Sequence, residues 1–436
     1  MPMLLNVVYL AALVALLPWV AWRRLSGGRP VAALWTRFSG RIAPFPPPAA
    51  AARIWMHGVS VGEVQLLATL AAEVAVQAAG AGRTVECVAS SSTTTGLEVA
   101  GRRFGPARVF PCPLDVTWAV ARVLDRVRPD LLVLGELELW PNLLAAARRR
   151  GIPVVVVNAR MSERSAAGYR RIGWLVRRML GQVSLVVARS RADGDRFAAA
   201  GANRVVVAGS MKFDGVRGDR GAPEIDRLRR LAGFSPDDVV FLAGSTQDPE
   251  ERLAAEAFLA ARQRHPSLRL VVVPRHVERT PEIGGLLDGL GLRWQTRSRL
   301  EADSPDPQAR VLLVDTTGEL SQWWGTATIA FVGGSLDGQR GGQNMLEPAA
   351  YGAAVAFGPH TGNFRDEVAV LLASDAAEVV ADGPGLTAFV GRCLAEPGWA
   401  ADRGRRAAAG VAAGRGATPL TARLLLECLA RTADSR

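Results

Sequence analysis

Residues 53–63 read Arg-Ile-Trp-Met-His-Gly-Val-Ser-Val-Gly-Glu, a short apolar run followed by a glycine-containing loop and the start of a helical stretch. Similar runs recur along the chain and alternate with longer Ala- and Arg-rich stretches. This alternation is typical of α/β proteins with parallel sheets. We predict strands at 53–56, 84–89, 131–134, 154–158, 185–188 and 205–208, and then at 239–243, 268–273, 311–314, 328–332 and 353–357.

The chain has 436 residues, which is too long for one hydrophobic core, so we expect two domains. A charged, glycine-containing stretch from Gly215 to Pro223 interrupts the alternation and marks a linker. The expected organisation is a membrane anchor at 1–24 and two Rossmann-like domains, at 25–215 and 216–436, that face a cleft. Ligands of such sheets bind beyond the carboxyl ends of the strands, so the segments after each strand are the candidate sites.

Met3 to Trp22 is almost continuously apolar and is followed by Arg23 and Arg24. About 20 apolar residues can span a bilayer, and terminal Trp and Arg residues suit an anchor whose following domain is cytoplasmic. A cleaved signal peptide is the main competing interpretation, but the stretch lacks a basic n-region and a small-residue cleavage site. A helix lying in the membrane interface is a further alternative.

The composition limits the function classes. The net charge of +11 predicts an anionic partner, such as nucleic acid, phospholipid head groups or a phosphorylated substrate. Nucleic acid is disfavoured because the arginines are dispersed and no RRM, KH or helix-turn-helix signature accompanies them. The four cysteines form no CxxC pair and the four histidines no HxxxH or HExxH pattern, so we expect neither a disulfide framework nor a metal site.

Three charged residues of the first half are candidates for chemistry. Ser60 and Glu63 have the spacing of a helix capping box, and Glu63 is equally suited to act as a general base. Glu136 and Glu138 follow the strand at 131–134; in extended backbone they share one face, where like charges raise a pKa or recruit a cation. Lys212, the sole lysine among 52 basic residues, is a candidate cation, because its compact ammonium differs from the wide guanidinium of arginine.

A simpler interpretation of Glu136 and Glu138 is also open. The helix expected to start at Trp140-Pro141 needs a polar start, and both carboxylates would then be solvated acids near its first turn.

The second half carries a strand that ends in Pro274-Arg275 and a glycine-rich segment from Gly333 to Gly342. A glycine-rich loop between a strand and a helix can place backbone N–H groups on a phosphate. Asn344 can cap the following helix, and Glu347 can accept hydrogen bonds from ribose hydroxyls. The segment is neither a Walker A sequence nor a regular GxGxxG.

Taken together these motifs resemble the 3-deoxy-D-manno-octulosonic acid (Kdo) transferases, membrane-anchored enzymes that move Kdo from CMP-Kdo onto a lipid A precursor. The resemblance covers nearly the whole chain and rests on HGVSVGE at 57–63, ELELWPNLL at 136–144, NARMSERSAAGY at 158–169, GSMKFD at 209–214, AGSTQDPEE at 243–251, VPRHVER at 273–279, TGEL at 317–320, FVGGS at 331–335 and the run from GGQNMLEPAA to Phe364.

The resemblance implies an α/β fold of the GT-B type and an inverting glycosyltransferase without metal or other cofactor, whose donor substrate is CMP-Kdo. Its other partners are a lipid A precursor (lipid IVA) and the inner membrane, with the catalytic domains facing the cytoplasm and no role for nucleic acid. It implies a proton acceptor at Glu63 and transition-state stabilisation at Glu136 and Lys212. The implied CMP contacts are Pro274, Arg275, Thr317, Gly318, Glu319, Asn344, Met345, Leu346 and Glu347.

The chain departs from the family pattern at several positions: Gln247 and Gln343 stand in place of His, Met345 of Pro, Leu137 of Thr, Trp324 of Tyr and Thr328 of Asp. These departures leave the three residues assigned to chemistry unchanged but put donor affinity and acceptor choice in question. Two alternatives remain: another GT-B enzyme that uses a UDP-sugar, either a transferase or an epimerase, and a non-catalytic, membrane-tethered protein that binds anionic lipid.

Overall fold

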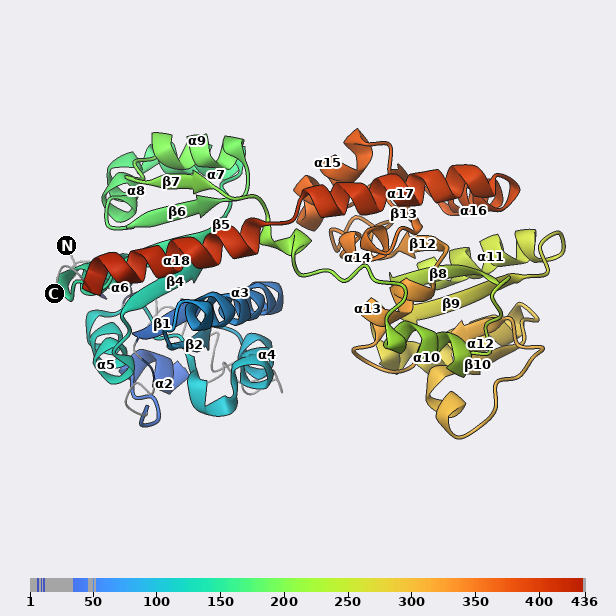
Figure 1. Cartoon of the computed structure of the whole chain (residues 1–436), viewed down its shortest axis with the longest axis horizontal. Coiled ribbons are helices and arrows are strands. Elements are labelled where there is room, and N and C mark those ends of the chain that lie inside the picture. Colours follow the sequence, from blue (N-terminus) through green and yellow to red (C-terminus); the bar gives the residue numbers. More distant parts are fainter. Residues whose placement is uncertain are drawn as a thin grey trace. The chain divides into compact units, whose positions relative to one another are not determined.

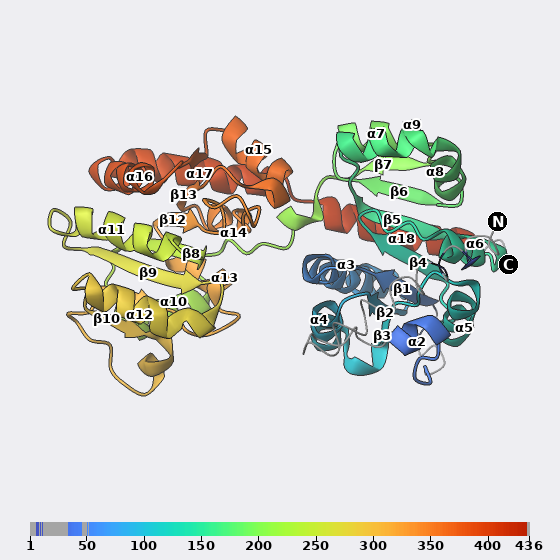
Figure 2. The ribbon, with the colours of Figure 1, turned by 180° about the vertical axis from the view of Figure 1, so that it is seen from behind.

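The computed structural model describes residues 6, 7, 9, 11, 34–45, 50 and 52–433, with side chains through residue 431. The chain divides into two compact units (Figures 1 and 2). Unit 1 comprises Met1–Gly215 and Arg415–Arg436, and unit 2 comprises Val216–Gly414. The anchor expected at 1–24 lies outside the described residues, apart from four single positions.

Unit 1 is built on a seven-stranded sheet whose strand pairs are all parallel. The strand order is β3-β2-β1-β4-β5-β6-β7, which contains the 3-2-1-4-5-6 order of a Rossmann sheet. The strands are β1 (Ala52–His57), β2 (Val85–Ser91), β3 (Val109–Pro111), β4 (Leu131–Gly135), β5 (Val154–Ala159), β6 (Leu185–Ala188) and β7 (Val205–Val207).

Helices cover both faces of this sheet, so alternate residues of its strands enter two different cores. On β1, Ile54 and Met56 pack with α3 (Val61–Gly80), whereas Trp55 packs with α5 (Thr117–Val127) and α6 (Pro141–Arg149). The other α-helices within the described part of this unit are α2 (Leu34–Ser39), α4 (Thr94–Phe104), α7 (Glu163–Arg171), α8 (Gly173–Leu180), α9 (Arg191–Ala199) and α18 (Ala417–Ala433).

The last helix of the chain, α18, belongs to unit 1, although we expected residues 216–436 to form one domain. Its residues Leu425 and Leu429 enter the same core as α3 and β1, and Figure 1 shows α18, in red, lying along the elements of unit 1. The helix start is held by Asp214, whose carboxylate accepts N–H groups of Gly416 at 2.6 Å and Thr418 at 2.7 Å. The chain therefore crosses between the units twice, a connection that the local strand and helix pattern does not reveal.

Unit 2 contains a second parallel sheet, in the order β10-β11-β9-β8-β12-β13-β14. Its strands are β8 (Val239–Thr246), β9 (Leu268–Pro274), β10 (Trp294–Thr296), β11 (Val311–Leu313), β12 (Ile329–Val332), β13 (Ala354–Phe357) and β14 (Ala377–Val379). The helices are α10 (Pro223–Leu231), α11 (Glu250–Arg262), α12 (Thr280–Gly289), α13 (Leu320–Trp323), α14 (Leu346–Ala350), α15 (Arg365–Ala373), α16 (Gly383–Ala395) and α17 (Pro397–Ala413).

Three strands were absent from the sequence prediction, namely β3, β10 and β14. Each has three residues and lies at an edge of its sheet. So short a run carries little periodic signal, and an edge strand is buried less continuously than a central one. The predicted strands correspond to β1, β2, β4 to β9 and β11 to β13, with ends that differ by up to three residues.

Among the described residues, α3 is the one helix long and apolar enough to cross a membrane. Length and composition are weak evidence for such a role, because the core helix of a globular domain has the same properties. Leu67, Leu70 and Val74 of α3 are buried in the core that the sheet shares with α18. We therefore interpret α3 as a core helix of unit 1.

Candidate active site

The candidate site of unit 1 lies where the strand order reverses, between β1 and β4. Ligands of open α/β sheets bind beyond the carboxyl ends of the strands at such a reversal. Strand β1 ends at His57 and leads into α3, while β4 ends at Gly135 and leads into α6. Glu63 and Glu136, both expected from the sequence, follow these two strands and so belong to the same edge of the sheet.

Glu63 occupies the first turn of α3 and forms the capping box that its spacing with Ser60 predicts. Ser60 Oγ accepts the N–H of Glu63 at 3.2 Å and donates to Glu63 Oε1 at 2.7 Å. The carboxylate also accepts the backbone N–H groups of Ser60 at 3.3 Å and Val59 at 2.9 Å. The carboxylate is thereby fixed, and a Cβ on Gly135 would lie 3.6 Å from Glu63 Oε2, so it adjoins the end of β4.

Glu136 stands in the turn directly after β4 with φ of 54°, in the left-handed region that residues other than glycine rarely adopt. Its N–H donates to Val157 O at 2.9 Å, which continues the β4–β5 ladder by one residue before the chain turns. The extended backbone that we assumed for 136–138 is therefore wrong at Glu136. Non-glycine residues in this region cost of order 1 kcal/mol or more, and such strain is often found at functional sites.

Electrostatic effects connect Glu136 with Glu63. The pKa of Glu136 is raised, first by burial and then by the negative charge of Glu63. The pKa of Glu138 is raised by the same two causes in the same order. Neither Glu136 nor Glu138 caps the backbone at the start of α6. Asp115 has this role, because its carboxylate accepts the N–H groups of Asn142 and Leu143 at 3.0 and 2.8 Å.

Lys212 lies in a short 3-10 turn, Met211–Phe213, that follows β7. Its positive charge lowers the pKa of Glu136, against the effect of burial, so the sole lysine acts on one of the two glutamates. The turn is held on both sides: Met211 N–H donates to Asn158 Oδ1 at 3.2 Å, and Asp214 caps α18. Glu63 and Lys212 thus both act electrostatically on Glu136 within unit 1. Their roles in chemistry stay predictions.

Sequence reasoning missed two cations of this group, Arg160 and Arg189, which also lower the pKa of Glu136. Each directly follows a strand, Arg160 after β5 and Arg189 after β6. Arg189 is only 6% exposed. The rule that ligands bind beyond strand ends could have identified both.

In unit 2 the strand order reverses between β8 and β12. Pro274 is buried at the end of the neighbouring β9, and Arg275 is exposed just beyond it. The Arg275 N–H donates to Thr246 O at 2.9 Å, so the ends of β8 and β9 are joined there. Two of the residues expected to contact CMP therefore lie beside the reversal.

Thr317, Gly318 and Glu319 form the turn before α13, and Thr317 and Gly318 are exposed. Glu319 accepts two hydrogen bonds from Arg297, at 3.0 and 2.8 Å, and one from Thr316 at 2.6 Å. Burial alone would raise the pKa of Glu319, but the bonds from Thr316 and Arg297 lower it. Its carboxylate is thus ionised and already paired. Arg297, which the sequence did not single out, fixes this turn.

The segment from Asn344 to Glu347 opens α14. Asn344 Oδ1 accepts the Leu346 N–H at 3.2 Å, and Asn344 Nδ2 donates to Glu347 Oε1 at 3.0 Å. Burial raises the pKa of Glu347, and the bond from Asn344 opposes this rise. The side chains of Met345 and Leu346 are completely buried, so any ligand contact there falls to their backbone.

The glycine-rich loop after β12 differs from our expectation of a phosphate cradle. Its N–H groups at Gly334, Ser335 and Leu336 donate to the buried carboxylate of Glu250, at 2.7, 3.0 and 3.2 Å. Glu250 also accepts the Gln247 N–H at 3.0 Å. Because an internal carboxylate occupies these donors, they are not available to a phosphate group.

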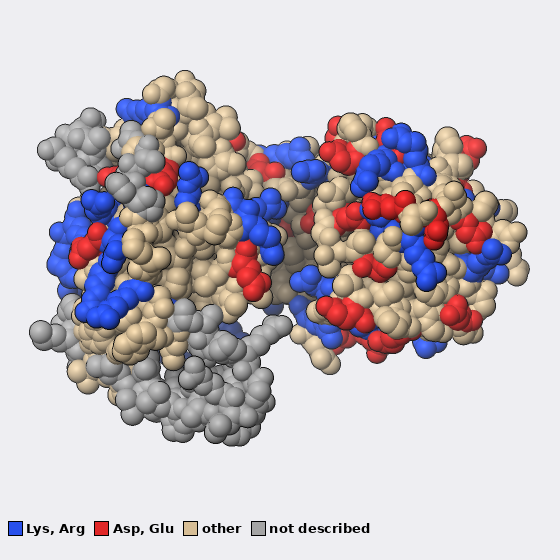
Figure 3. Space-filling view, turned by 90° about the horizontal axis from the view of Figure 1, so that it is seen from below, with Lys and Arg blue, Asp and Glu red and all other residues tan. Residues whose placement is uncertain are grey.

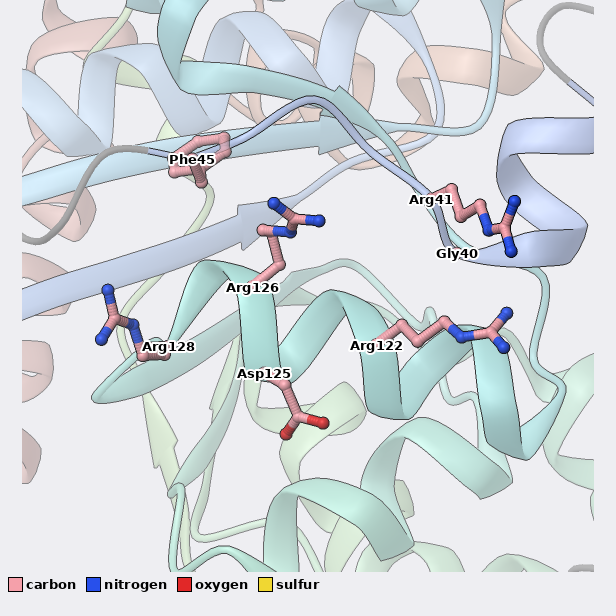
Figure 4. A pocket seen from close by; sticks show the side chains of 7 residues that line it. All are labelled: Gly40, Arg41, Phe45, Arg122, Asp125, Arg126 and Arg128. Carbon is pink, nitrogen blue, oxygen red and sulfur yellow. The ribbon is translucent and has the colours of Figure 1, made fainter.

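Two further features lie on the surface of the units. Unit 1 has a pocket of about 480 Å³ between α5 and the segment before β1, and its arginine side chains are shown in Figure 4; it is lined by Gly40, Arg41, Phe45, Arg122, Asp125, Arg126 and Arg128. Figure 3 shows basic side chains interspersed with acidic ones on both units.

Within the described part of the chain, no three His, Cys, Asp or Glu side chains are grouped to hold a metal ion.

Comparisons with known proteins agree with these two sheets. A glycosyltransferase from Rickettsia africae superposes on this chain with a TM-score of 0.54 at 13% sequence identity. The superposition covers 88% of this chain and 99% of the Rickettsia chain. A UDP-GlcNAc 2-epimerase from Neisseria meningitidis has a TM-score of 0.55 at 12% identity and covers 87% and 100%. Identities this low show the fold alone, which is α/β with two parallel Rossmann-like sheets of the GT-B type.

Sequence relatives are more specific. The sequence profile described as 3-deoxy-D-manno-octulosonic-acid transferase (kdotransferase) matches residues 35–215. A 3-deoxy-D-manno-octulosonic acid transferase from Bordetella pertussis is 36% identical in an alignment of 439 positions, which covers 95% of this chain and 97% of that protein. With this identity over nearly the full length of both proteins, the chain belongs to the Kdo transferase family of glycosyltransferases.

Proposed function

We propose that this glycosyltransferase moves Kdo from CMP-Kdo onto a lipid A precursor, lipid IVA, with inversion at the anomeric carbon. The observation that carries the proposal is that Glu63 and Glu136 follow the two strands of the reversal in unit 1, with Glu63 next to the end of β4, while the positive charge of Lys212 acts on Glu136. In this proposal unit 1 binds the acceptor and unit 2 binds the nucleotide. The donor is the substrate, and no metal or other cofactor takes part.

Glu63 acts in this proposal as the general base. Its carboxylate is oriented by Ser60 and Val59, so it needs little reorganisation before it takes the proton of the acceptor hydroxyl. The hydroxyl oxygen then attacks the anomeric carbon of Kdo, and the bond to the phosphate oxygen of CMP breaks on the opposite face. The electron pair of the broken bond leaves with CMP.

Glu136 and Lys212 stabilise the transition state in this proposal. Charge develops at the reacting carbon and on the departing phosphate, and fixed charges in a partly buried site act on it more strongly than they would in water. The cationic side chains of Lys212, Arg160 and Arg189 already act on Glu136. They can offset the charge of the donor carboxylate in the same place.

For the nucleotide we propose contacts from Pro274 and Arg275, from Thr317 to Glu319, and from Asn344 to Glu347. Support comes from the position of Pro274 and Arg275 at the end of β9, beside the strand reversal of unit 2, and from the fixed turns that hold Glu319 and Asn344. Arg275 is exposed and can pair with the phosphate of CMP.

For localisation we propose the inner membrane, with an N-terminal anchor at residues 1–24 and both units in the cytoplasm. Support comes from the apolar run at 3–22, the net charge of +11 and the arginine-lined pocket on α5. Near an anionic membrane surface each Lys or Arg contributes about 1 kcal/mol to attachment.

The test is transfer by the purified full-length protein, with CMP-Kdo and lipid IVA, measured as CMP release and as the mass of the lipid product. A mass increase by one or more Kdo units that is lost in Glu63→Gln supports the proposal. Transfer from a UDP-sugar instead, or CMP-Kdo binding without a lipid product in any condition, contradicts it and favours one of the two alternatives.

A further inference from the structure

Two glutamine side chains that are distant in sequence flank the same glycine in unit 2. A Cβ on Gly334 would lie 3.1 Å from Gln247 Nε2 and 3.4 Å from Gln343 Nε2. Gln247 follows β8, and Gln343 lies in the segment that leads into α14. The two amides, which we call the amide pair, therefore adjoin the strand reversal between β8 and β12.

Gln247 is built into the protein but is incompletely satisfied. Its side chain is 4% exposed, and its Oε1 atom has no hydrogen-bond partner among the described residues. The hydroxyl of the preceding Thr246 is also buried and also has no hydrogen-bond partner among the described residues. Buried acceptors without a donor are uncommon in folded proteins, because most buried polar groups form a hydrogen bond with another part of the protein or with water. A ligand group that donates a hydrogen bond would complete Gln247.

The position of the amide pair is set by Glu250. One carboxylate oxygen, Glu250 Oε2, accepts both the Gln247 N–H at 3.0 Å and the Gly334 N–H at 2.7 Å. Gly334 O in turn accepts the Gly342 N–H at 2.9 Å, which places the adjacent Gln343. Gly334 has φ of 65°, so a larger residue would strain the backbone, and its Cβ would lie in tight contact with the Gln247 amide.

The amide pair also stands between residues proposed to hold CMP. On one side, Arg275 N–H donates to Thr246 O at 2.9 Å, directly before Gln247. On the other side, Asn344 follows Gln343 in the chain. A sugar nucleotide held by Arg275 and Asn344 would therefore lie next to the pair.

The chemistry of the pair selects the group that it binds. Phosphate and carboxylate groups only accept hydrogen bonds, so neither can satisfy Gln247 Oε1. The carboxylate of Glu250 is bonded to the backbone N–H groups of Gln247 and Gly334, so its negative charge also disfavours an anion next to the amide pair. A hydroxyl both donates and accepts, and it therefore matches an amide oxygen together with an amide N–H.

We propose that Gln247 and Gln343 bind hydroxyl groups of the donor sugar, with Glu250 as the positioning residue that holds them. This inference rests on the proposed function, since the sugar nucleotide it requires is CMP-Kdo. It adds a specificity-determining site to the nucleotide contacts.

The experiment measures dissociation constants of CMP and of CMP-Kdo by titration calorimetry, in a Glu63→Gln background in which the donor is not consumed. Gln247→Ala and Gln343→Ala each weaken CMP-Kdo binding about three- to tenfold, the usual effect of one lost hydrogen bond, and change CMP binding less than about twofold. The matched control is Gln339→Ala, an exposed glutamine between Gly334 and Gln343, which changes neither constant.

Two results overturn the inference: unchanged CMP-Kdo binding, or equal weakening of CMP and CMP-Kdo, which would place the pair on the nucleotide. Thermal unfolding of each variant reports its folding. If Gln247→Ala does not fold, Gln343→Ala, which is only partly buried, decides alone.

Turnover of the wild-type chain separates this inference from the proposed function. A selective loss of CMP-Kdo binding together with a wild type that transfers no Kdo to lipid IVA leaves the amide pair standing and removes the function. Normal Kdo transfer by the wild type, together with unchanged CMP-Kdo binding in the glutamine variants, leaves the proposed function standing and removes the amide pair. A chain that binds no CMP-Kdo at all overturns both.

Discussion

Ser60 Oγ donates a hydrogen bond to Glu63 Oε1 at 2.7 Å and accepts one from the Glu63 N–H at 3.2 Å. The sequence left a choice between Glu63 as a helix cap and Glu63 as a general base. The geometry makes these roles compatible, because the cap orients the carboxylate while leaving it partly exposed. A base that is held in place loses little entropy when it meets its substrate.

Replacing Glu63 with Gln therefore separates the two roles. Glutamine keeps one oxygen, which can accept the Val59 N–H in place of Oε2 or the Ser60 N–H in place of Oε1, but not both. One bond of the cap is therefore lost, and we expect the free energy of unfolding to fall by about 1 kcal/mol. Loss of the base should lower kcat by about 10²- to 10⁴-fold. The measurement is CMP release under donor saturation, and Glu73→Gln on the same helix is the matched control. Near-normal turnover in Glu63→Gln contradicts the assignment.

Glu136 should cost stability at neutral pH. Burial and the charge of Glu63 raise its pKa above 4.5, so the ionised carboxylate is less favourable in the folded state than in the unfolded state. This cost is complete above the raised pKa and disappears as the pH falls below 4.5. We expect Glu136→Gln to unfold at a higher temperature than wild type at pH 7.5, with a difference that shrinks toward pH 4.5, and to lose activity.

Circular dichroism melts of wild type and Glu136→Gln across this pH range test that expectation. Glu98→Gln, an exposed carboxylate on α4, is the control. A variant less stable than wild type at pH 7.5 would show that the bonds around Glu136 favour its ionised form.

His57 should have the opposite dependence on pH. Burial lowers its pKa from 6.5 to about 4, although a hydrogen bond with Ser90 opposes the shift. The unfolded chain therefore binds a proton below pH 6.5 that the folded chain takes up only near pH 4, and stability falls across this interval. The loss is on the order of 3 kcal/mol.

We expect His57→Gln to reduce the slope of unfolding free energy against pH between 6.5 and 4. Urea unfolding at a series of pH values measures it, with the exposed His276→Gln as the control. An identical slope in His57→Gln and wild type would assign the effect to other groups.

Lys212 tests whether a charge or a particular shape is needed. Asn158 and Asp214 fix the backbone on both sides of Lys212, so the turn is not free to shift for a wider guanidinium. We expect Lys212→Arg to lower kcat at least about tenfold with an unchanged melting temperature, and Arg171→Lys, an exposed exchange on α7, to change neither. A fully active Lys212→Arg would mean that any cation suffices.

The sequence was sufficient for the parts of this protein that depend on local pattern. The central strands are short, mostly apolar runs, and the spacing of Ser60 and Glu63 predicts their capping box. Contacts between distant segments could not be read in this way. The packing of α18 on unit 1 depends on Leu425 and Leu429 meeting a sheet formed more than 200 positions earlier, and Arg189, which follows another strand, acts electrostatically on Glu136. The glycine-rich loop has the composition of a phosphate site, but Glu250 reaches it from the start of α11.

Glu250 provides the last prediction, because one side chain supplies the acceptor for four backbone N–H groups. Glu250→Ala leaves these donors buried without a partner, at about 1–3 kcal/mol for each before relaxation. We expect unit 2 to lose more than about 3 kcal/mol of stability and the amides of 334–336 to lose protection in hydrogen-exchange mass spectrometry. Glu250→Gln retains one oxygen and should lose less stability and less exchange protection than Glu250→Ala. The control is Glu256→Ala, exposed on the same helix, whose stability should stay within about 0.5 kcal/mol of wild type. Unchanged protection at 334–336 in Glu250→Ala would mean that other contacts hold the loop, and the amide pair would then not depend on Glu250.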